Sequence, residues 1–146
     1  MRIAIGADHG GFELKEELKR HLLNQKHDVL DVGARKPDPR DDYTDFSHGV
    51  AHAMQSLSCS RGIVICTTGA GTCIVANKYP GVRAVECANI EDVRQAREHL
   101  DANIMTIGAI KVPRGVVREM ADAFLETGAR HGRHQRRRDK IEARKG

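Results

Sequence analysis

Five short apolar runs alternate with longer amphipathic stretches along this chain, and that alternation constrains its fold more than any other feature. The runs cover residues 2–6, 28–32, 62–66, 82–85 and 104–107. Short runs rich in Ile and Val are typical of strands buried in a parallel sheet, and strands that alternate with helices are joined by right-handed crossovers. The sequence therefore predicts one α/β domain over residues 1–146, a three-layer α/β/α Rossmann-like fold with a five-stranded parallel sheet.

The stretches between these runs predict helices, because their apolar residues recur near helical spacing. The expected helices cover residues 12–25, 43–57, 70–78, 90–100 and 113–126, followed by a basic C-terminal helix within about 131–144, chiefly 133–144. Pro113 is expected in the first turn of its helix, where proline is favoured. A polar loop, residues 33–42, precedes the second helix, and its conformation cannot be derived from the residues.

Composition narrows the class of protein. The chain has 146 residues, 40% hydrophobic and 30% charged, as in an ordinary globular domain. Aromatic residues make up only 3%, which argues against stacking platforms for single-stranded nucleic acid. No apolar stretch reaches the roughly 18 residues that span a bilayer, and the first residues read as a strand rather than a secretion signal. We expect a cytoplasmic protein with no membrane partner.

The sequence contains no complete signature of a metal site or of a nucleotide-binding site. The four cysteines form no CxxC pair, which favours reduced thiols: Cys59, Cys66, Cys73 and Cys87. His48 and His52 are four residues apart, but Gly49 stands where the metalloprotease signature has Glu. Residues 69–71 give half of a dinucleotide fingerprint, with Ile74 at the third glycine position, and no GxxxxGK[ST] loop exists. We expect no metal and no cofactor.

The strongest functional signal is the segment GIVICTTGAGTCIVANKYPG, residues 62–81, in which a strand ends in Cys66 and enters a glycine-rich loop. Open α/β sheets bind ligands at the carboxyl ends of their strands, where Asp8, His9 and Cys66 are expected to meet. Loop amides and a helix start favour an anion and a thiolate, which suits acyl transfer or proton abstraction beside a carbonyl. The simpler alternative is a buried structural cysteine.

Positive charge is concentrated at the C-terminus. Residues 130–146 hold eight Lys or Arg and two acids, a local +6 within a total of +4, which leaves −2 for the preceding residues. Such a tail is compatible with nucleic-acid binding, a solvated helix or a site for a small phosphate ester. The body of the chain offers no recognised nucleic-acid fold, so we expect no nucleic-acid partner.

Four motifs, in order, resemble the ribose-5-phosphate isomerase B family, which includes allose and galactose phosphate isomerases. They are IGADHGGF, ICTTGAG with IVANKYPGVRA, REHLDAN and GRHQRRRDKI. The resemblance implies reversible conversion of an aldose phosphate into a ketose phosphate through an enediolate, with ribose 5-phosphate and ribulose 5-phosphate of the pentose phosphate pathway as the default pair. A noncatalytic sugar-phosphate-binding protein remains an alternative.

The resemblance also implies roles for individual residues. Cys66 is the base that moves a proton between C1 and C2, and the loop amides hold the enediolate oxygen. His99, with Thr68 and Asp8, opens the sugar ring. Taken singly, Asp8 and Thr68 could instead cap helices, and His99 could lie at a helix end.

Substrate binding follows from the same resemblance. Arg133 and Arg137, four residues apart on one helix face, grip the phosphate together with His9, and His134 is a lesser candidate for the sugar end. Arg136 and Arg138 are expected to be solvated. The other implied binding residues are Tyr43, Thr67, Gly69, Ala70, Gly71, Leu100 and Lys111. The cleft forms between two subunits, so a homodimer is the minimum active unit and a tetramer is an alternative.

Three residues depart from the family pattern. Leu100 stands where Asn is usual, Ile110 where Arg is usual, and Thr67 where Gly follows the cysteine. Lys111 is the expected substitute for the missing Arg. Loss of a charged hydrogen bond weakens binding by about 1.5–3 kcal/mol, so we hypothesise a different four- to six-carbon sugar phosphate as substrate.

Overall fold

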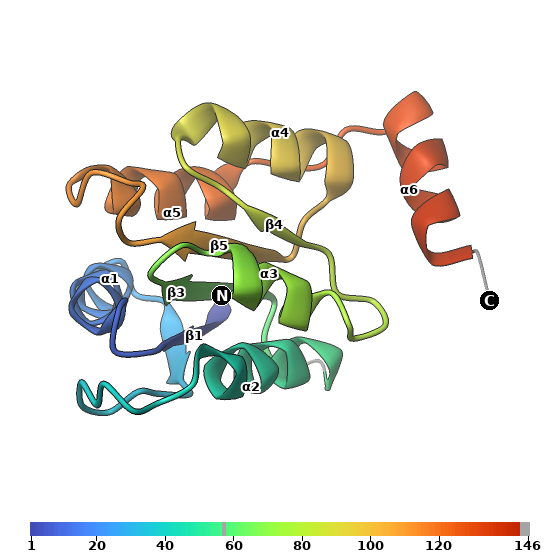
Figure 1. Cartoon of the computed structure of the whole chain (residues 1–146). Helices are drawn as coiled ribbons and strands as arrows, with labels where there is room; N and C mark the ends of the chain where they lie inside the picture. Colours follow the sequence, from blue (N-terminus) through green and yellow to red (C-terminus); the bar gives the residue numbers. More distant parts are fainter. Residues whose placement is uncertain (57, 144–146) are drawn as a thin grey trace.

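The computed structural model describes residues 1–56 and 58–143 and has the predicted fold (Figure 1). All pairs in its sheet are parallel, in the order β2-β1-β3-β5-β4. The strands are β1 (Arg2–Ala7), β2 (Asp28–Asp31), β3 (Arg61–Cys66), β4 (Ala84–Glu86) and β5 (Ile104–Gly108). Because the chain leaves β1 toward β2 and later returns to its other side with β3, the predicted switch point lies between β1 and β3.

Helices cover both faces of the sheet. They are α1 (Phe12–Asn24), α2 (Tyr43–Gln55), α3 (Ala70–Ala76), α4 (Ile90–Leu100), α5 (Val116–Glu126) and α6 (Arg133–Ala143). Apolar residues of α1, α4 and α5 pack in one core cluster, and those of α2 and α3 pack in a second cluster on the opposite face. Strand β3 is central and contributes to both, with Ile63 and Ile65 on one face and Val64 on the other. This explains its uninterrupted apolar run.

Several predicted boundaries were wrong, each because of a local contact. Helix α5 begins at Val116, since Val116 N donates to Pro113 O at 3.0 Å and the proline opens this turn instead of the helix. Helix α3 ends at Ala76 because the Asn77 side chain bonds to both backbone groups of Ala84. That contact aligns β4, which begins two residues later than predicted. Leu57 and Arg144, in the predicted helices, lie outside the described residues.

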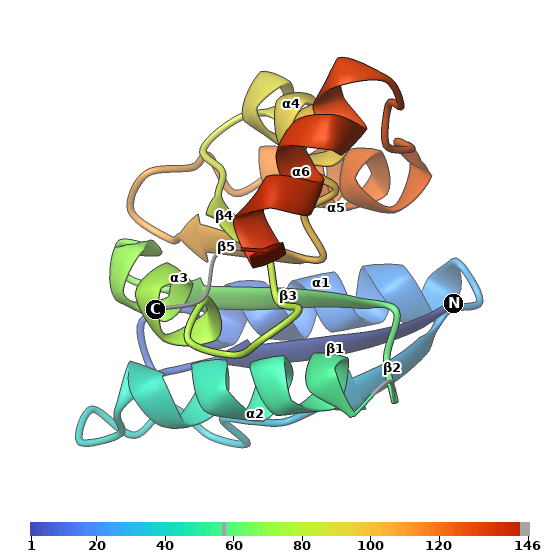
Figure 2. The ribbon, with the colours of Figure 1, turned by 90° about the vertical axis from the view of Figure 1, so that its right-hand side faces the viewer.

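Helix α6 projects beyond the sheet and lies beside α4 (Figure 2). The Arg138 guanidinium holds it there, with Nη1 donating to His99 O at 3.2 Å and to Arg130 O at 2.8 Å. Arg138 is therefore half-buried, so its predicted solvation is wrong. Among residues 1–56 and 58–143, no helix combines the length and apolar character needed to cross a bilayer.

Candidate active site

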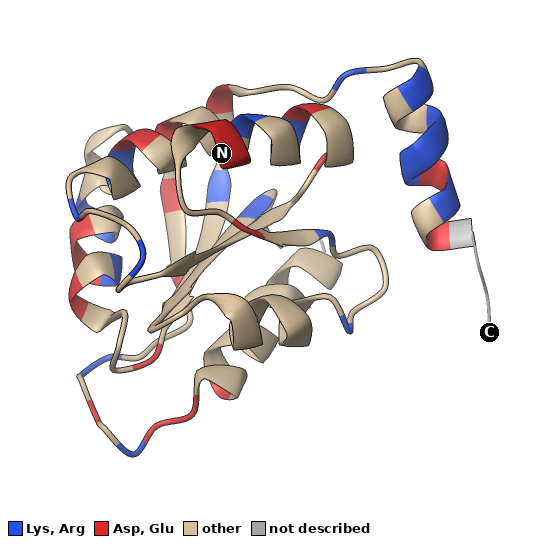
Figure 3. Ribbon diagram, turned by 45° about the horizontal axis from the view of Figure 1, so that its top comes forward, with Lys and Arg blue, Asp and Glu red and all other residues tan. Residues whose placement is uncertain are grey.

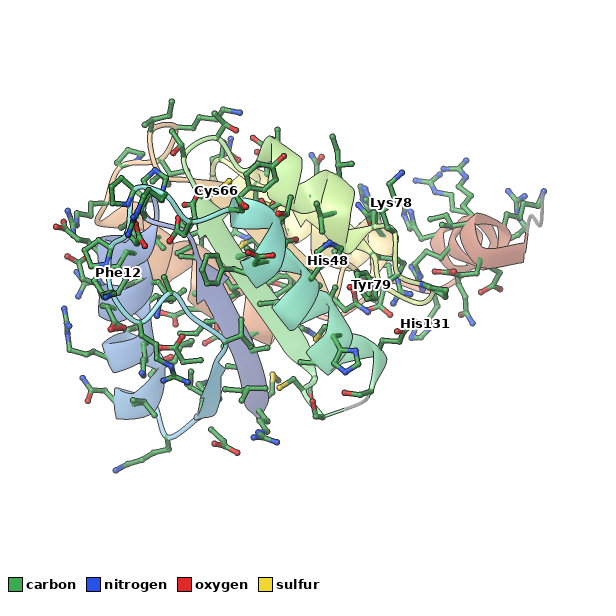
Figure 4. All side chains as sticks on the ribbon, turned by 60° about the horizontal axis from the view of Figure 1, so that its bottom comes forward. Phe12, His48, Cys66, Lys78, Tyr79 and His131 are labelled. Atoms are coloured by element: carbon green, nitrogen blue, oxygen red, sulfur yellow. The ribbon has the colours of Figure 1, made fainter. Side chains whose placement is uncertain are left out.

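Cys66 ends β3 and is followed by a loop that wraps its sulfur (Figure 4). The side chain is buried, and Sγ accepts a hydrogen bond from Gly69 N at 3.1 Å and lies 3.5 Å from Thr72 Oγ1. Gly69 adopts φ 80°, and a Cβ there would lie 2.8 Å from Gly108 N. The turn therefore requires glycine both for its left-handed backbone and for its close approach to β5. We call residues 67–71 the cysteine loop.

The end of β1 packs directly against the cysteine loop. A Cβ on Gly10 would collide with Thr67 Oγ1, so the glycine allows the two segments to touch. Asp8 is buried, accepts a hydrogen bond from Gly10 N at 2.9 Å, and has its pKa raised chiefly by desolvation. The N-cap residues of α1 and α3 are Gly11 and Gly69, and neither helix has a side-chain cap, so neither Asp8 nor Thr68 serves as a helix cap.

Asp41 joins this edge from the loop before α2, and no motif in the sequence distinguishes it from the neighbouring acids. Its Oδ1 accepts from His9 N at 3.1 Å and lies 2.7 Å from His9 Nδ1. Asp8, His9 and Asp41 each present a ligand atom within 4.8 Å of the others, a set that could hold a cation. However, Nδ1 and Oδ1 face each other in a hydrogen bond, which leaves them poorly directed toward a shared metal ion.

The remaining predicted residues on this edge lie around the cysteine loop. Tyr43, at the start of α2, covers Gly71 so closely that a Cβ there would lie 2.6 Å from its ring. Thr67, Thr68 and Ala70 are exposed, as a ligand-facing loop requires. Lys111 Nζ donates to Glu86 Oε2 at 3.0 Å, so the predicted substitute for the missing arginine is already paired with a carboxylate.

His99, at the end of α4, lies beside the edge strand β4 and not at the carboxyl ends of the strands. Arg83 immediately precedes β4, and its Nε donates to Leu100 O at 3.2 Å, which places the end of α4 at the amino end of that strand. Strand β4 begins level with the start of β3, whereas Cys66 ends β3. The two levels differ by four strand residues, about 13 Å. The structure therefore does not bring His99 and Cys66 together within one chain.

A second group of predicted residues surrounds His99. Its imidazole stacks on that of His134, with ring centroids 4.4 Å apart and planes 3° from parallel. Desolvation, His99 and the neighbouring arginines lower the pKa of His134. Arg133 and Arg137 are exposed on α6, and His99 and Leu100 line a cavity of about 260 Å³ beside β4. His99 comes from α4 and the other three titratable residues of this group from α6, along which Lys and Arg are concentrated (Figure 3).

The predicted residues thus form two separate clusters. The carboxyl-edge cluster is Asp8, His9, Tyr43, Cys66, Thr67, Thr68, Gly69, Ala70, Gly71 and Lys111, with Asp41 added by the structure. The α4–α6 cluster is His99, Leu100, Arg133, His134 and Arg137. The first offers a sulfur, amides and an acid, and the second offers imidazoles and guanidinium groups.

Comparison with known proteins identifies the family to which this chain belongs. A family model described as Ribose/Galactose Isomerase matches residues 3–141. The chain belongs to this family, as its motifs predicted, and it is an aldose–ketose isomerase.

Individual relatives match over nearly their whole length. Ribose-5-phosphate isomerase B of Escherichia coli is 37% identical over 97% of this chain and 95% of its own. A 4-deoxy-4-sulfo-D-erythrose isomerase of a Clostridium species is 38% identical over 88% of this chain and 80% of its own.

Solved structures agree closely with this fold. Ribose-5-phosphate isomerase B of Clostridium thermocellum has a TM-score of 0.94 and 43% identity, covering 97% of this chain and 95% of that one. The Mycoplasma genitalium enzyme with bound ribulose-5-phosphate has a TM-score of 0.93 and 37% identity, covering 97% and 93%.

Proposed function

We propose that this protein interconverts ribose 5-phosphate and ribulose 5-phosphate through an enediolate, with Cys66 as the base. The observation that carries the proposal is the position of Cys66 Sγ. It accepts a hydrogen bond from Gly69 N and lies beneath the cysteine loop, which is largely exposed. A donor aimed at the sulfur suits a thiolate, which accepts hydrogen bonds. The family membership and the ribulose-5-phosphate complex of a relative support the sugar phosphate as substrate.

The loop supplies groups for the intermediate. The first helical hydrogen bond of α3 runs from Cys73 N to Gly69 O, so helix geometry leaves the amides of Ala70 and Gly71 for a ligand. They receive the enediolate oxygen while Cys66 removes a proton from one carbon and returns it to the next. Two such donors at a developing negative charge are worth a few kcal/mol each in an enclosed site. The Gly69 amide serves the sulfur instead.

The separation of the two clusters supports a site shared by two copies of the chain. His99, Arg133 and Arg137 have the chemistry for ring opening and phosphate binding, yet they lie at the opposite edge from Cys66. The α4–α6 cluster of one copy then faces the carboxyl-edge cluster of the other. The surface of α2 and α3 is available for such contact, because Asp45 is their one charged residue and Tyr43 and Ile74 are 41% and 62% exposed (Figure 3).

A different sugar phosphate is a second candidate substrate. Lys111 is paired with Glu86, and the side chain of Ile110 carries no charge, so neither replaces the usual arginine as a free cation. Leu100, 39% exposed beside His99, brings an apolar side chain to the sugar end. The relative named as a 4-deoxy-4-sulfo-D-erythrose isomerase indicates that this fold serves more than one ligand.

The test is Cys66→Ala, assayed beside wild type on four-, five- and six-carbon aldose phosphates. Loss of a catalytic base lowers kcat by about 10²–10⁴-fold, and we expect phosphate-ester binding to stay within about threefold of wild type. Cys59→Ala is the matched control, since Cys59 is buried in the α2 core cluster away from the cysteine loop. Wild-type turnover by Cys66→Ala would contradict the proposal, and so would binding without turnover by wild type.

A further inference from the structure

The loop before α2 places a single acid against the proposed site. The Asp41 side chain is 14% exposed, although the residues on either side of it, Arg40 and Asp42, are exposed. A turn anchors it, with Asp41 N donating to Asp38 O at 3.0 Å. Its Oδ1 accepts hydrogen bonds from both the main-chain N and the ring Nδ1 of His9, at 3.1 and 2.7 Å. One oxygen thereby restrains the backbone and the ring of the same residue.

This contact sets the chemistry of the His9 imidazole. Because Nδ1 donates to the carboxylate, Nε2 is the ring nitrogen left to face solution, and the side chain is 40% exposed. The pKa of His9 is raised, first by the Asp41 hydrogen bond and also by the charges of Asp8 and Asp38, while partial desolvation opposes them. These groups favour an imidazolium whose Nε2–H is an oriented donor for an anion.

Fold stability alone accounts poorly for Asp41. Its second oxygen, Oδ2, is buried and has no hydrogen-bond partner among the residues that the structure describes. A buried carboxylate oxygen without a partner costs stability, so folding alone does not explain an acid at this position. A cation fixed here also adds positive charge on the edge where Lys111 is paired with Glu86 and residue 110 is Ile.

We propose that Asp41 is a positioning residue that holds His9 as an oriented imidazolium for the anionic end of the substrate. This inference rests on the proposed function, in which His9 meets the phosphate ester. Asp41 does not touch the reacting carbons, so its effect belongs to KM. The ordinary pKa of histidine is about 6.5, and a raised value keeps the imidazolium present at higher pH. The affinity for the anionic substrate is then lost only as pH rises through the raised pKa of His9.

Two substitutions separate charge from position. Asp41→Asn keeps an acceptor for Nδ1 and removes the charge, whereas Asp41→Ala removes both. We expect KM for the sugar phosphate, and the inhibition constant of inorganic phosphate, to rise about threefold in Asp41→Asn and about tenfold in Asp41→Ala, the latter ~1.4 kcal/mol. We expect kcat to stay within about twofold, since the base is unaltered. In both variants KM should begin to rise at a lower pH than in wild type.

Asp28→Asn is the matched control, because Asp28 is a 73% exposed acid at the start of β2, outside both clusters and the α2–α3 surface, and the substitution removes the same charge. It should leave KM unchanged. His9→Asn should raise KM at least as much as Asp41→Ala. NMR titration of the His9 ring should give a lower pKa in Asp41→Asn than in wild type, a readout independent of turnover.

The outcomes separate this inference from the proposed function. If His9→Asn raises KM while Asp41→Ala matches wild type, Asp41 has no positioning role and the proposed function stands. An unchanged KM in His9→Asn, or an unchanged His9 titration in Asp41→Asn, also overturns the inference. If wild type turns over no aldose phosphate, the proposed function fails, and phosphate affinity with the NMR titration still decides the role of Asp41.

Discussion

Gly69 shows how much of the site depends on single residues. Its left-handed backbone turns the chain out of β3, its amide reaches Cys66 Sγ, and its carbonyl accepts from Thr72 and Thr106 hydroxyls at 3.0 and 2.8 Å. No other residue type combines that backbone with an approach to β5 free of a Cβ. The position of the sulfur therefore depends on the absence of a side chain three residues away.

Gly69→Ala should destabilise the protein and impair turnover. The cost combines the left-handed backbone, about 1–2 kcal/mol, with the contact that Cβ makes at 2.8 Å from Gly108 N. Gly81→Ala is the matched control, since φ is 81° there and a Cβ would meet nothing within 4 Å. Urea unfolding should give a larger loss for Gly69→Ala, together with a lower kcat. Equal losses and equal kcat values would contradict this account of the loop.

Residue-level sequence reasoning located part of this site. It predicted the cysteine loop and its proximity to Asp8, because the carboxyl ends of parallel strands lie on the same side of the sheet. It missed the Asp41–His9 contact, since the path of a polar loop is not encoded in any local pattern. It also assigned Lys111 and Arg138 to free roles, while the structure pairs Lys111 with Glu86 and bonds Arg138 to two carbonyls.

At the scale of elements, a buried ion pair joins α1 to β2. Lys15 is fully buried, and its Nζ donates to both Asp31 oxygens at 2.9 Å, with Lys19 Nζ also 2.9 Å from Oδ2. Burial raises the pKa of Asp31, but the bonds from Lys15, Lys19 and Gly33 N outweigh it and leave the pKa lowered. A lowered carboxyl pKa contributes stability above the ordinary value, which is lost as pH falls through the folded value.

Asp31→Asn should lower the free energy of unfolding by about 3 kcal/mol at pH 7, because it removes the nearer counterion of the buried Lys15 ammonium and leaves the more distant Glu16 Oε2, at 3.6 Å. The difference from wild type should shrink as pH falls below the ordinary carboxyl pKa of about 3.9 and through the lowered pKa of folded Asp31. Asp28→Asn, at the other end of β2, removes a 73% exposed carboxylate paired with Arg2 and should cost under about 1 kcal/mol. Similar losses in both variants, measured by urea unfolding, would count against the buried pair.

Element types were predictable where periodicity was strong, and their ends were not. Every strand and helix of the described residues was predicted, because the central strands are continuous apolar runs and the helices repeat their apolar residues at helical spacing. The ends depended on individual hydrogen bonds that hydrophobic periodicity does not reveal, such as those of the Asn77 side chain with Ala84 and the bond that places Pro113 in a turn before α5. The position of α6 likewise follows from the bonds of Arg138 to the carbonyl of His99 on α4 and to that of Arg130 just before α6.

At the scale of the whole molecule, the separation of the two clusters argues against an active site formed within one chain. The α4–α6 cluster projects beside the sheet, and the cysteine loop lies at its carboxyl edge (Figures 1 and 2). A symmetric dimer pairs each cluster with its complement twice, since a two-fold interface repeats every contact. Under the proposed function, catalysis therefore requires two copies of the chain, although all the catalytic residues come from one sequence.

Mixing of inactive subunits tests this claim most directly. Cys66→Ala and His99→Asn chains, each inactive alone, should regain turnover when they are unfolded and refolded together. In each mixed dimer one site receives both intact side chains, so random pairing should restore about a quarter of wild-type activity. Refolding of either variant alone is the control. Activity that stays at the level of the separate variants, although mixed dimers form, would contradict a site shared between two chains.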